Sequence, residues 1–338
     1  MSRGRLGVSI MPLDNRRDVL VGTATAADAR GWDGFFLPET WAYDITVLLA
    51  EAAVRTQRIV LGTGIASVWG RSAGTLAMAS ATLASISGGR FVLGLGASTP
   101  QLTEGFHDVP YAAPLERLRR TLTQVRALLR GERVPLAVAT GARALKLNVP
   151  AGLDVPIYLA ALADGSIRLA GEVADGWIPF LYPRSRLATG IALLAEGAAR
   201  SADPGRRVVV CPSVPAVVAP DPVKAREGAA WFVTFYLTTM GPLYRQRLVQ
   251  LGFGKEVQAV LAANTPKSRG VVPPDAEALL EELTVFGTPD QARSRLARWY
   301  AAGAEFPTLL LLPHLTVAEI EFTLDAFRPM SAAGAAGG

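Results

Sequence analysis

The strongest constraint on the fold of this chain is the regular alternation of short apolar runs with longer segments of helical spacing. The apolar runs are residues 5–11, 34–38, 58–65, 90–96, 155–160, 176–180, 207–218 and 307–312. Segments of helical spacing occupy 18–30, 45–55, 74–86, 114–129, 166–173, about 184–200, 221–263 and the stretch after residue 312. Apolar runs of this kind are typical of parallel strands that are buried on both faces. Eight strand–helix units predict an α/β fold, a closed (β/α)8 TIM barrel, in preference to an open doubly wound sheet.

Residues 131–154 interrupt this rhythm, and we expect them to be an insertion of short extended pieces. No shift in composition marks a domain boundary, so residues 1–330 are predicted to form a single barrel domain. The small residues of the tail, 331–338, are predicted to be flexible.

Composition narrows the classes of function. Half of the residues are hydrophobic, which provides for a sizeable core and argues against disorder. The net charge of +5 comes from arginines spread along the chain, and no basic segment is interleaved with aromatic residues, so no nucleic-acid partner is predicted. The chain has one cysteine and two histidines, which predicts neither an internal disulfide nor a metal site. Cys211 lies in an apolar run and is expected to be a small buried hydrophobic residue.

The chain is expected to work in the cytoplasm and away from membranes. The first residues run directly into the first predicted strand without the pattern of a signal peptide. No apolar run reaches the length of a membrane span.

Small residues gather where the predicted strands end, which is the face of a barrel that carries function. They follow the third strand at 62–65, the fourth at 94–99 and the fifth at 160–166. Such residues let a large flat cofactor approach the backbone, and the cofactor then supplies the chemistry. They are also compatible with simple packing at the rim of the barrel. Gly165 and Ser166 lie at the start of a predicted helix, whose free N–H groups predict a phosphate-binding site, here called the phosphate seat. The alternative is that Ser166 only caps the helix.

Several segments together resemble the luciferase-like monooxygenase superfamily, over roughly residues 5–326. They are TQRIVLGTGIASVWGRSAGTLA (56–77), TLASISGGRFVLGLGAS (82–98), YAAPLERLRR (111–120), VPIYLAALADGSIRLAGEVADGWIPF (155–180) and FGTPDQARSRL (286–296). The start of the 114–129 helix is similar to the coenzyme F420-dependent branch, which includes methylenetetrahydromethanopterin reductase. Arg120 departs from that branch, whose members usually have glutamate there.

The resemblance implies a barrel that binds coenzyme F420, with FMN as the alternative cofactor. It also implies a bulge at the end of the third strand, with a non-prolyl cis peptide bond at Gly64–Ile65, behind the cofactor ring. The residues that it places around the ring are Glu39, Thr40, Thr63, Gly64, Ile65, Ala97 and Ser98. Those that it places at the phosphate are Ala161, Leu162, Ala163, Asp164, Gly165 and Ser166.

The same resemblance bears on the reaction. Sugar-phosphate dehydrogenases of the branch have a histidine and a carboxylate where this chain has Thr40 and Thr99. Without those acid–base groups, hydride transfer from reduced F420 to a C=C or C=N bond is favoured over alcohol oxidation. Glu39 and Thr40 are the predicted catalytic residues, and the proton would come from a hydroxyl, a water or Glu39, if burial raises the pKa of Glu39.

Four further residues are predicted to wall the substrate pocket, although each is also compatible with a place in the core or on the surface. They are Trp41, Trp69 and Trp177, and His107 in the expected loop after the fourth strand, with His314 as a weaker candidate. The aromatic stretch 231–244 could line the mouth of the pocket or form the face of a dimer. The expected partners are a small-molecule or natural-product substrate and a second copy of the chain.

Two other functions fit the same residues. A reduced-FMN-dependent luciferase-like monooxygenase would use the same strand ends. A non-catalytic flavin-binding homologue would keep them as relics.

Overall fold

The computed structural model describes residues 4–150, 152–203 and 205–328. The described strands all pair in parallel, in the order β7-β6-β5-β4-β3-β2-β1-β10-β8-β9. They are β1 (Gly7–Ile10), β2 (Gly34–Pro38), β3 (Val60–Ser67), β4 (Phe91–Gly96), β5 (Ile157–Ala160), β6 (Gly176–Ile178), β7 (Val209–Val210), β8 (Ser213–Val218), β9 (Val285–Gly287) and β10 (Thr308–Leu311). The predicted tail at 331–338 lies outside the described residues.

The sheet curls and closes at the segment that was predicted to be one strand, 207–218. Its first part, β7, pairs with β6, and its second part, β8, pairs with β10. A parallel bridge between Phe180 and Ser213 joins the end of β6 to the start of β8. The prediction of one strand was therefore wrong in detail: Pro212 has no N–H to donate, and the chain changes neighbours at this point. The predicted (β/α)8 barrel is confirmed, with β9 as an additional short strand beside β8.

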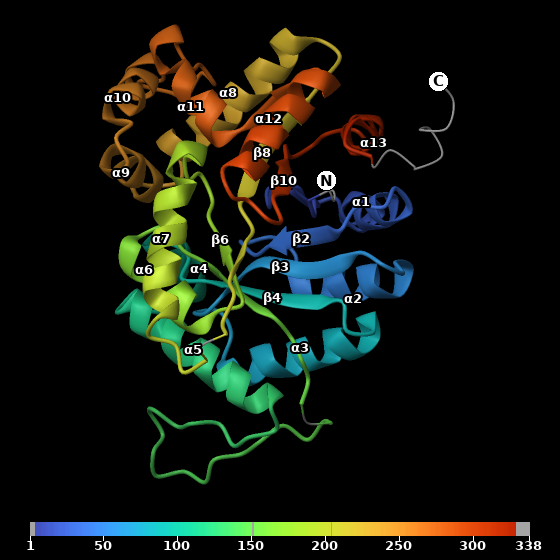
Figure 1. The fold of residues 1–338 in the computed structure, drawn as a ribbon, viewed down its shortest axis with the longest axis vertical. Coiled ribbons are helices and arrows are strands. Elements are labelled where there is room, and N and C mark those ends of the chain that lie inside the picture. The colour runs from blue at the N-terminus through green and yellow to red at the C-terminus, as the bar shows by residue number, and fades with distance from the viewer. Residues whose placement is uncertain (1–3, 151, 204, 329–338) are drawn as a thin grey trace.

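Helices surround the sheet (Figure 1). They are α1 (Arg17–Ala29), α2 (Ile45–Arg55), α3 (Ala73–Ser87), α4 (Pro100–His107), α5 (Pro114–Leu129), α6 (Asp164–Val173), α7 (Leu187–Ala198), α8 (Pro222–Thr238), α9 (Leu243–Gln250), α10 (Gly254–Ala263), α11 (Glu277–Leu283), α12 (Pro289–Ala301) and α13 (Val317–Ala326), with short 3-10 turns at Arg184–Arg186 and Pro274–Ala276. In Figure 1, α8 to α11 form a group of their own at one end of the molecule. That group is the chain's long insertion between β8 and β9.

Local sequence explains where several helices begin. The side chains of Asp44, Ser72, Thr99, Asp221 and Thr316 each accept a hydrogen bond from a backbone N–H of the first turn that follows. These are the residue types that satisfy the free donors of a helix start. The cap at Thr99, followed by a proline, creates α4 in a segment that was expected to be a loop.

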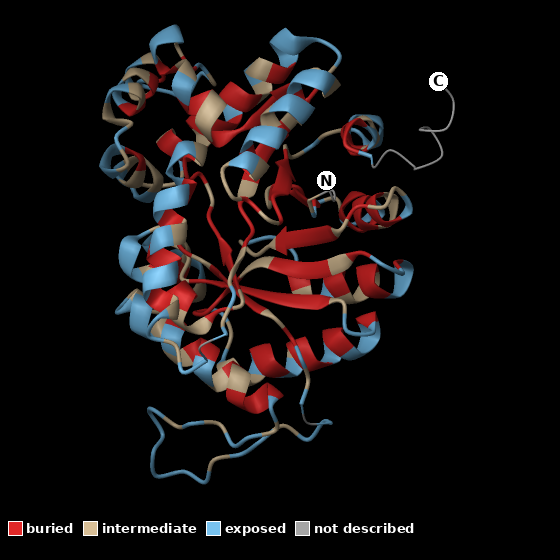
Figure 2. Cartoon of the chain, in the orientation of Figure 1, coloured by how far each residue is buried: buried red, intermediate tan, exposed pale blue. Residues whose placement is uncertain are grey.

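Burial follows the layers of the fold, as Figure 2 shows: most residues of the strands are buried, and the helices expose their outer faces. Inside the barrel, Phe36 packs edge-to-face against Phe306 with ring centroids 5.6 Å apart. A Cβ at Gly62 would lie 2.5 Å from the Phe36 ring, and one at Gly176 would lie 2.5 Å from the Tyr158 ring. Glycine at position 62, in β3, therefore leaves room for the Phe36 ring.

The described residues of the 131–154 insertion form no helix or strand, and most of them are exposed. Its ends lie close together, because the N–H of Leu153 donates to the carbonyl of Leu129 over 3.2 Å. The insertion therefore leaves and rejoins the barrel at almost the same place.

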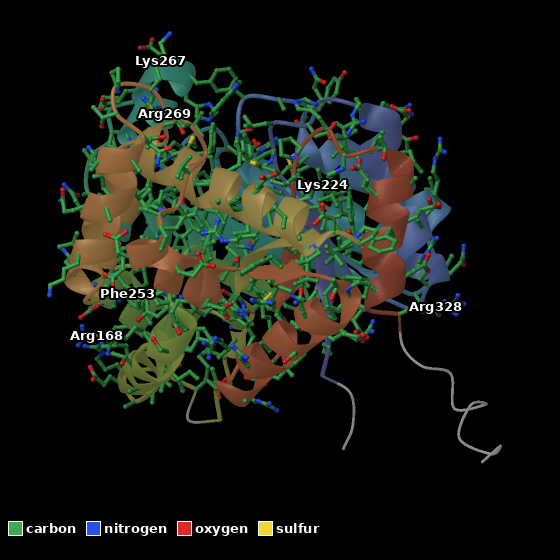
Figure 3. The ribbon with its side chains drawn as sticks, turned by 90° about the horizontal axis from the view of Figure 1, so that it is seen from above. Arg168, Lys224, Phe253, Lys267, Arg269 and Arg328 are labelled. Atoms are coloured by element: carbon green, nitrogen blue, oxygen red, sulfur yellow. The ribbon has the colours of Figure 1, made fainter. Side chains whose placement is uncertain are left out.

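The surface charge is dispersed. Figure 3 shows Arg168, Lys224 and Arg328 far apart on the outside of the molecule. Among the described residues, no helix has the length and apolar character needed to cross a bilayer.

Candidate functional site

A cavity of about 1000 Å³ opens at the carboxyl ends of the barrel strands. Its floor includes Phe36, Ile178, Cys211 and Thr308, which point into the barrel. Cys211 is 1% exposed, as expected, and burial raises the pKa of its thiol to about 12. The volume lies at the upper end of the range of about 300–1,000 Å³ that is typical of ligand pockets.

Most of the predicted site residues line this cavity. They are Glu39, Thr40, Trp41, Gly64, Ile65, Ala97, Ser98, Ala161, Leu162, Ala163, Gly165 and Ser166. Those that do not line it are Thr63, Trp69, His107, Asp164 and Trp177. His314 also lies outside the lining, and its backbone N–H donates to Asp14.

Thr63 stabilises a bulge in β3 and does not face the cavity. Between Gly62 and Ala66 β3 advances four residues while its partner β4 advances only three, from Val92 to Leu95. The Thr63 hydroxyl donates to the carbonyl of Gly94 (2.8 Å) and accepts from its N–H (2.7 Å). The extra residue turns the strand end toward the cavity.

The predicted cis peptide bond at Gly64–Ile65 is wrong, because this bond is trans in the structure. The bulge explains the difference, since one added residue bends the strand end without a change of peptide isomer. Gly64 and Ile65 nevertheless line the cavity, and their contact with a cofactor stays a prediction. A Cβ at Gly64 would lie 3.1 Å from the nitrogen of Pro38, so the bulge brings two backbones close together.

Glu39 belongs to a half-enclosed ion-pair network at the rim. Its Oε1 accepts from Arg71 (2.7 Å to Nη2), and its Oε2 accepts from the N–H of Ser67 (2.7 Å). Arg71 also pairs with Asp44 at 2.9 Å. Burial alone would lower the pKa of Arg71, but Glu39 and Asp44 together raise it above its usual value. Glu39 therefore ties the segment after β2 to the end of β3.

Trp69 and Trp177 hold strand ends from outside the cavity. The indole N–H of Trp69 donates to the carbonyl of Ala97 over 2.7 Å, and that of Trp177 donates to the carbonyl of Ala161 over 2.8 Å. Trp177 is fully buried and packs edge-to-face on Tyr182. Their predicted place in the pocket wall was wrong, because the sequence does not reveal which side of a strand end a side chain occupies. Trp41 does line the cavity and is half exposed.

His107 ends α4 and packs away from the cavity. A Cβ at Gly70 would lie 2.4 Å from the His107 ring, so the two residues are in close contact. Its Nε2 is buried and has no hydrogen-bond partner among the described residues. The predicted pocket role of His107 was wrong because the segment is a helix, and the cavity is lined instead by Gly105 and Phe106.

The start of α6 has the features of an anion site. The helix begins at Asp164 with Ala163 as its N-cap, and the Ser166 hydroxyl donates to the Ala163 carbonyl, so Ser166 is not the cap. The first N–H groups of a helix have no acceptor within it. Asp164 points elsewhere and pairs with Arg247 of α9 at 2.6 Å.

Arg247 is a residue that sequence reasoning missed. Its Nε is buried without a hydrogen-bond partner among the described residues, and its side chain is 13% exposed. It reaches the start of α6 from 83 residues away, and nothing in the local sequence signals this contact.

Comparison with known proteins shows the family to which this chain belongs. The model of the luciferase-like monooxygenase family matches residues 3–305. The chain belongs to this family. It is 32% identical over 305 residues to a Mycobacterium tuberculosis protein whose name assigns it to the coenzyme F420-dependent oxidoreductases, covering 82% of this chain and 86% of the relative.

Two further proteins agree with that placement. A 5,10-methylenetetrahydromethanopterin reductase of Methanolobus tindarius is 26% identical over 283 residues, covering 81% of this chain and 84% of the relative. The structure of the coenzyme F420-dependent tetrahydromethanopterin reductase of Methanopyrus kandleri aligns with a TM-score of 0.77 at 19% identity, covering 97% and 98% of the two chains. The fold is therefore that of this family, and the chain is a luciferase-like oxidoreductase.

Proposed function

We propose that this chain is an F420-dependent reductase, and that its cofactor binds across the carboxyl ends of β2 to β5. The observation that carries the proposal is one cavity that joins a wall of small residues to the open start of α6. The name of the Mycobacterium tuberculosis relative supports the choice of F420.

The described residues fit such a group. Gly64, Gly96, Ala97 and Ala161 line one wall with nothing longer than a methyl group, so a flat ring system can approach the backbone. At Gly165 an added Cβ would meet only one atom, 3.7 Å away, so the space beside the helix start is open. A phosphate there would meet free N–H groups and the positive end of the helix dipole.

Reduced F420, when bound, supplies a hydride, and we propose a C=C or C=N bond of an organic molecule as the acceptor. The other atom of that bond then takes a proton. Glu39 is an ion-paired acceptor with both oxygens engaged, so we assign it a positioning role and not the proton. The Thr40 hydroxyl lines the cavity, but it donates its only hydrogen to the carbonyl of Pro12 (3.1 Å). We therefore propose that the proton comes from a water molecule held near Thr40.

We also propose that the protein works as a cytoplasmic homodimer. The aromatic stretch 231–244 does not supply the dimer face in this proposal, because Phe235, Tyr236 and Tyr244 face the cavity. Trp231 remains 37% exposed on the outside of α8.

The phosphate seat gives a direct test of the cofactor position. Arg247 does not line the cavity, but it pairs with Asp164 at the start of α6, and we propose that its guanidinium also reaches a phosphate bound there. Arg247→Gln is then expected to weaken binding of F420 about tenfold or more, the usual worth of one charge-assisted hydrogen bond. The same variant should leave binding of the phosphate-free deazaflavin chromophore unchanged. Both affinities are measured by fluorescence titration, with Arg245→Gln on the same helix as the control. An equal loss for both ligands would contradict this position of the phosphate.

A further inference from the structure

The cavity has a second wall that differs sharply from the wall of small residues. It is built by the loop after β6 and by α8 and α9, which belong to the insertion between β8 and β9. The residues that form it are Phe180, Phe235, Tyr236, Met240, Leu243 and Tyr244, which we call the aromatic wall. If the cofactor occupies the strand ends, the aromatic wall faces the space left for the substrate.

Charge is nearly absent from the whole lining. Among the described residues that line the cavity, Glu39 is the only charged one, and it is already paired with Arg71. A charged substrate group placed against the aromatic wall would lose its water and find no partner of opposite sign. Burial of an unpaired charge is among the most unfavourable changes in protein energetics.

The aromatic wall is rigid and suits a flat ligand. The Tyr236 ring lies 4.8 Å from that of Phe180 and 5.3 Å from that of Tyr244, both edge-to-face, and it stacks on Phe232 at 5.1 Å. Rings locked in this way present fixed edges and faces to a planar molecule.

Two hydroxyl groups give this wall its polar character. Among the described residues, no hydrogen bond is formed by the phenol oxygen of Tyr236 or of Tyr244. Burial raises the pKa of both phenols, so each remains a neutral O–H donor. A free O–H in an apolar wall is suited to a neutral acceptor such as a carbonyl oxygen.

We propose that the substrate is a neutral, flat and largely apolar molecule whose carbonyl oxygen accepts a hydrogen bond from Tyr236 or Tyr244. This inference rests on the proposed function, because it assigns the strand ends to the cofactor. It adds the substrate class and two specificity-determining residues that come from the insertion.

The test uses three probes of matched shape on the full-length protein saturated with oxidised F420. Chalcone is a neutral planar enone, 4-carboxychalcone adds one negative charge, and trans-stilbene has no carbonyl. Dissociation constants come from calorimetric titration at pH 7.5. Chalcone is expected to bind at least about tenfold more tightly than 4-carboxychalcone, because the carboxylate has no partner in the lining.

Variants then locate the carbonyl contact. Tyr236→Phe or Tyr244→Phe should weaken chalcone binding about three- to tenfold, the net worth of one hydrogen bond, without changing stilbene binding. Tyr43→Phe, at an exposed tyrosine outside the lining, is the control and should change neither.

Three results would overturn the inference: equal or tighter binding of 4-carboxychalcone, no binding of chalcone to the F420-loaded protein, or equal effects of the tyrosine variants on chalcone and stilbene. Failure of F420 itself to bind would instead contradict the proposed function. The titration of cofactor before the probes separates the two.

Discussion

Single buried polar side chains determine how the strand ends are held. Trp69 and Trp177 each donate one N–H to a backbone carbonyl beside the cavity, and Thr63 bonds both backbone groups of Gly94. None of these side chains lines the cavity. They are positioning residues, which explains why a site lined by small residues can still have a defined shape.

The sequence predicted the residues that line the cavity better than the positioning residues behind them. Gly64, Ala97 and Gly165 line the cavity because small residues that follow parallel strands lie at one face of a barrel. Trp177 was predicted to wall the pocket but lies outside it. The sequence does not show on which side of the strand end its side chain lies.

Asp28 allows a test of the fold at the scale of one residue. It is 8% exposed, and its carboxylate accepts from the N–H groups of Gln57, Arg58 and Ile59, which joins α1 to the segment before β3. Burial alone would raise the pKa of Asp28, but these three hydrogen bonds outweigh it and hold the pKa below its usual value. Its stabilising effect is therefore present above the unfolded pKa and is lost as the pH falls through the folded pKa.

Asp28→Asn is expected to lower the free energy of unfolding at pH 7 by about 1–3 kcal/mol, because a buried amide cannot accept all three hydrogen bonds. The difference from the wild type should shrink in acid as the wild-type carboxylate becomes protonated. Urea denaturation at a series of pH values measures it, with the exposed Asp154→Asn as control. A difference that stays constant with pH would contradict the assignment.

At the scale of elements, the alternation of strands and helices was largely predictable. The predicted bounds of β2, α2 and α5 agree with the structure, because each of these elements has a clear apolar pattern and clear ends. The exceptions have physical causes. The 207–218 strand divides at Pro212, and α4 forms where a cap and a proline outweigh a polar, loop-like sequence.

The 131–154 insertion gives a prediction at this scale. Limited trypsin digestion is expected to cut first at Arg133, Arg143 or Lys146, because these lie in an exposed segment without helix or strand. Since the ends of the insertion are joined near the barrel, the nicked protein should keep its circular dichroism spectrum and its affinity for F420. Mass spectrometry of the fragments identifies the cuts, and the fluorescence of the tryptophans, most of which are buried, reports unfolding. First cuts within α8 to α11, or loss of structure on nicking, would contradict this account.

At the scale of the whole molecule, two parts of the chain that are distant in sequence form one cavity. The strand ends of β2 to β5 provide the wall of small residues, and the insertion between β8 and β9 provides the aromatic wall. The first wall follows from the repeat of the barrel and could be predicted. The second depends on how α8 and α9 fold back over the barrel, which the pattern of 221–263 left open.

The most direct test of the central claim is a pair of titrations of the purified protein, one with oxidised F420 and one with FMN, followed by fluorescence. The account predicts saturable binding of F420 at one molecule per chain and weaker binding of FMN. Tighter binding of FMN would contradict it and favour an oxygen-using monooxygenase, and binding of neither would contradict the placement of any flavin-like cofactor in this cavity.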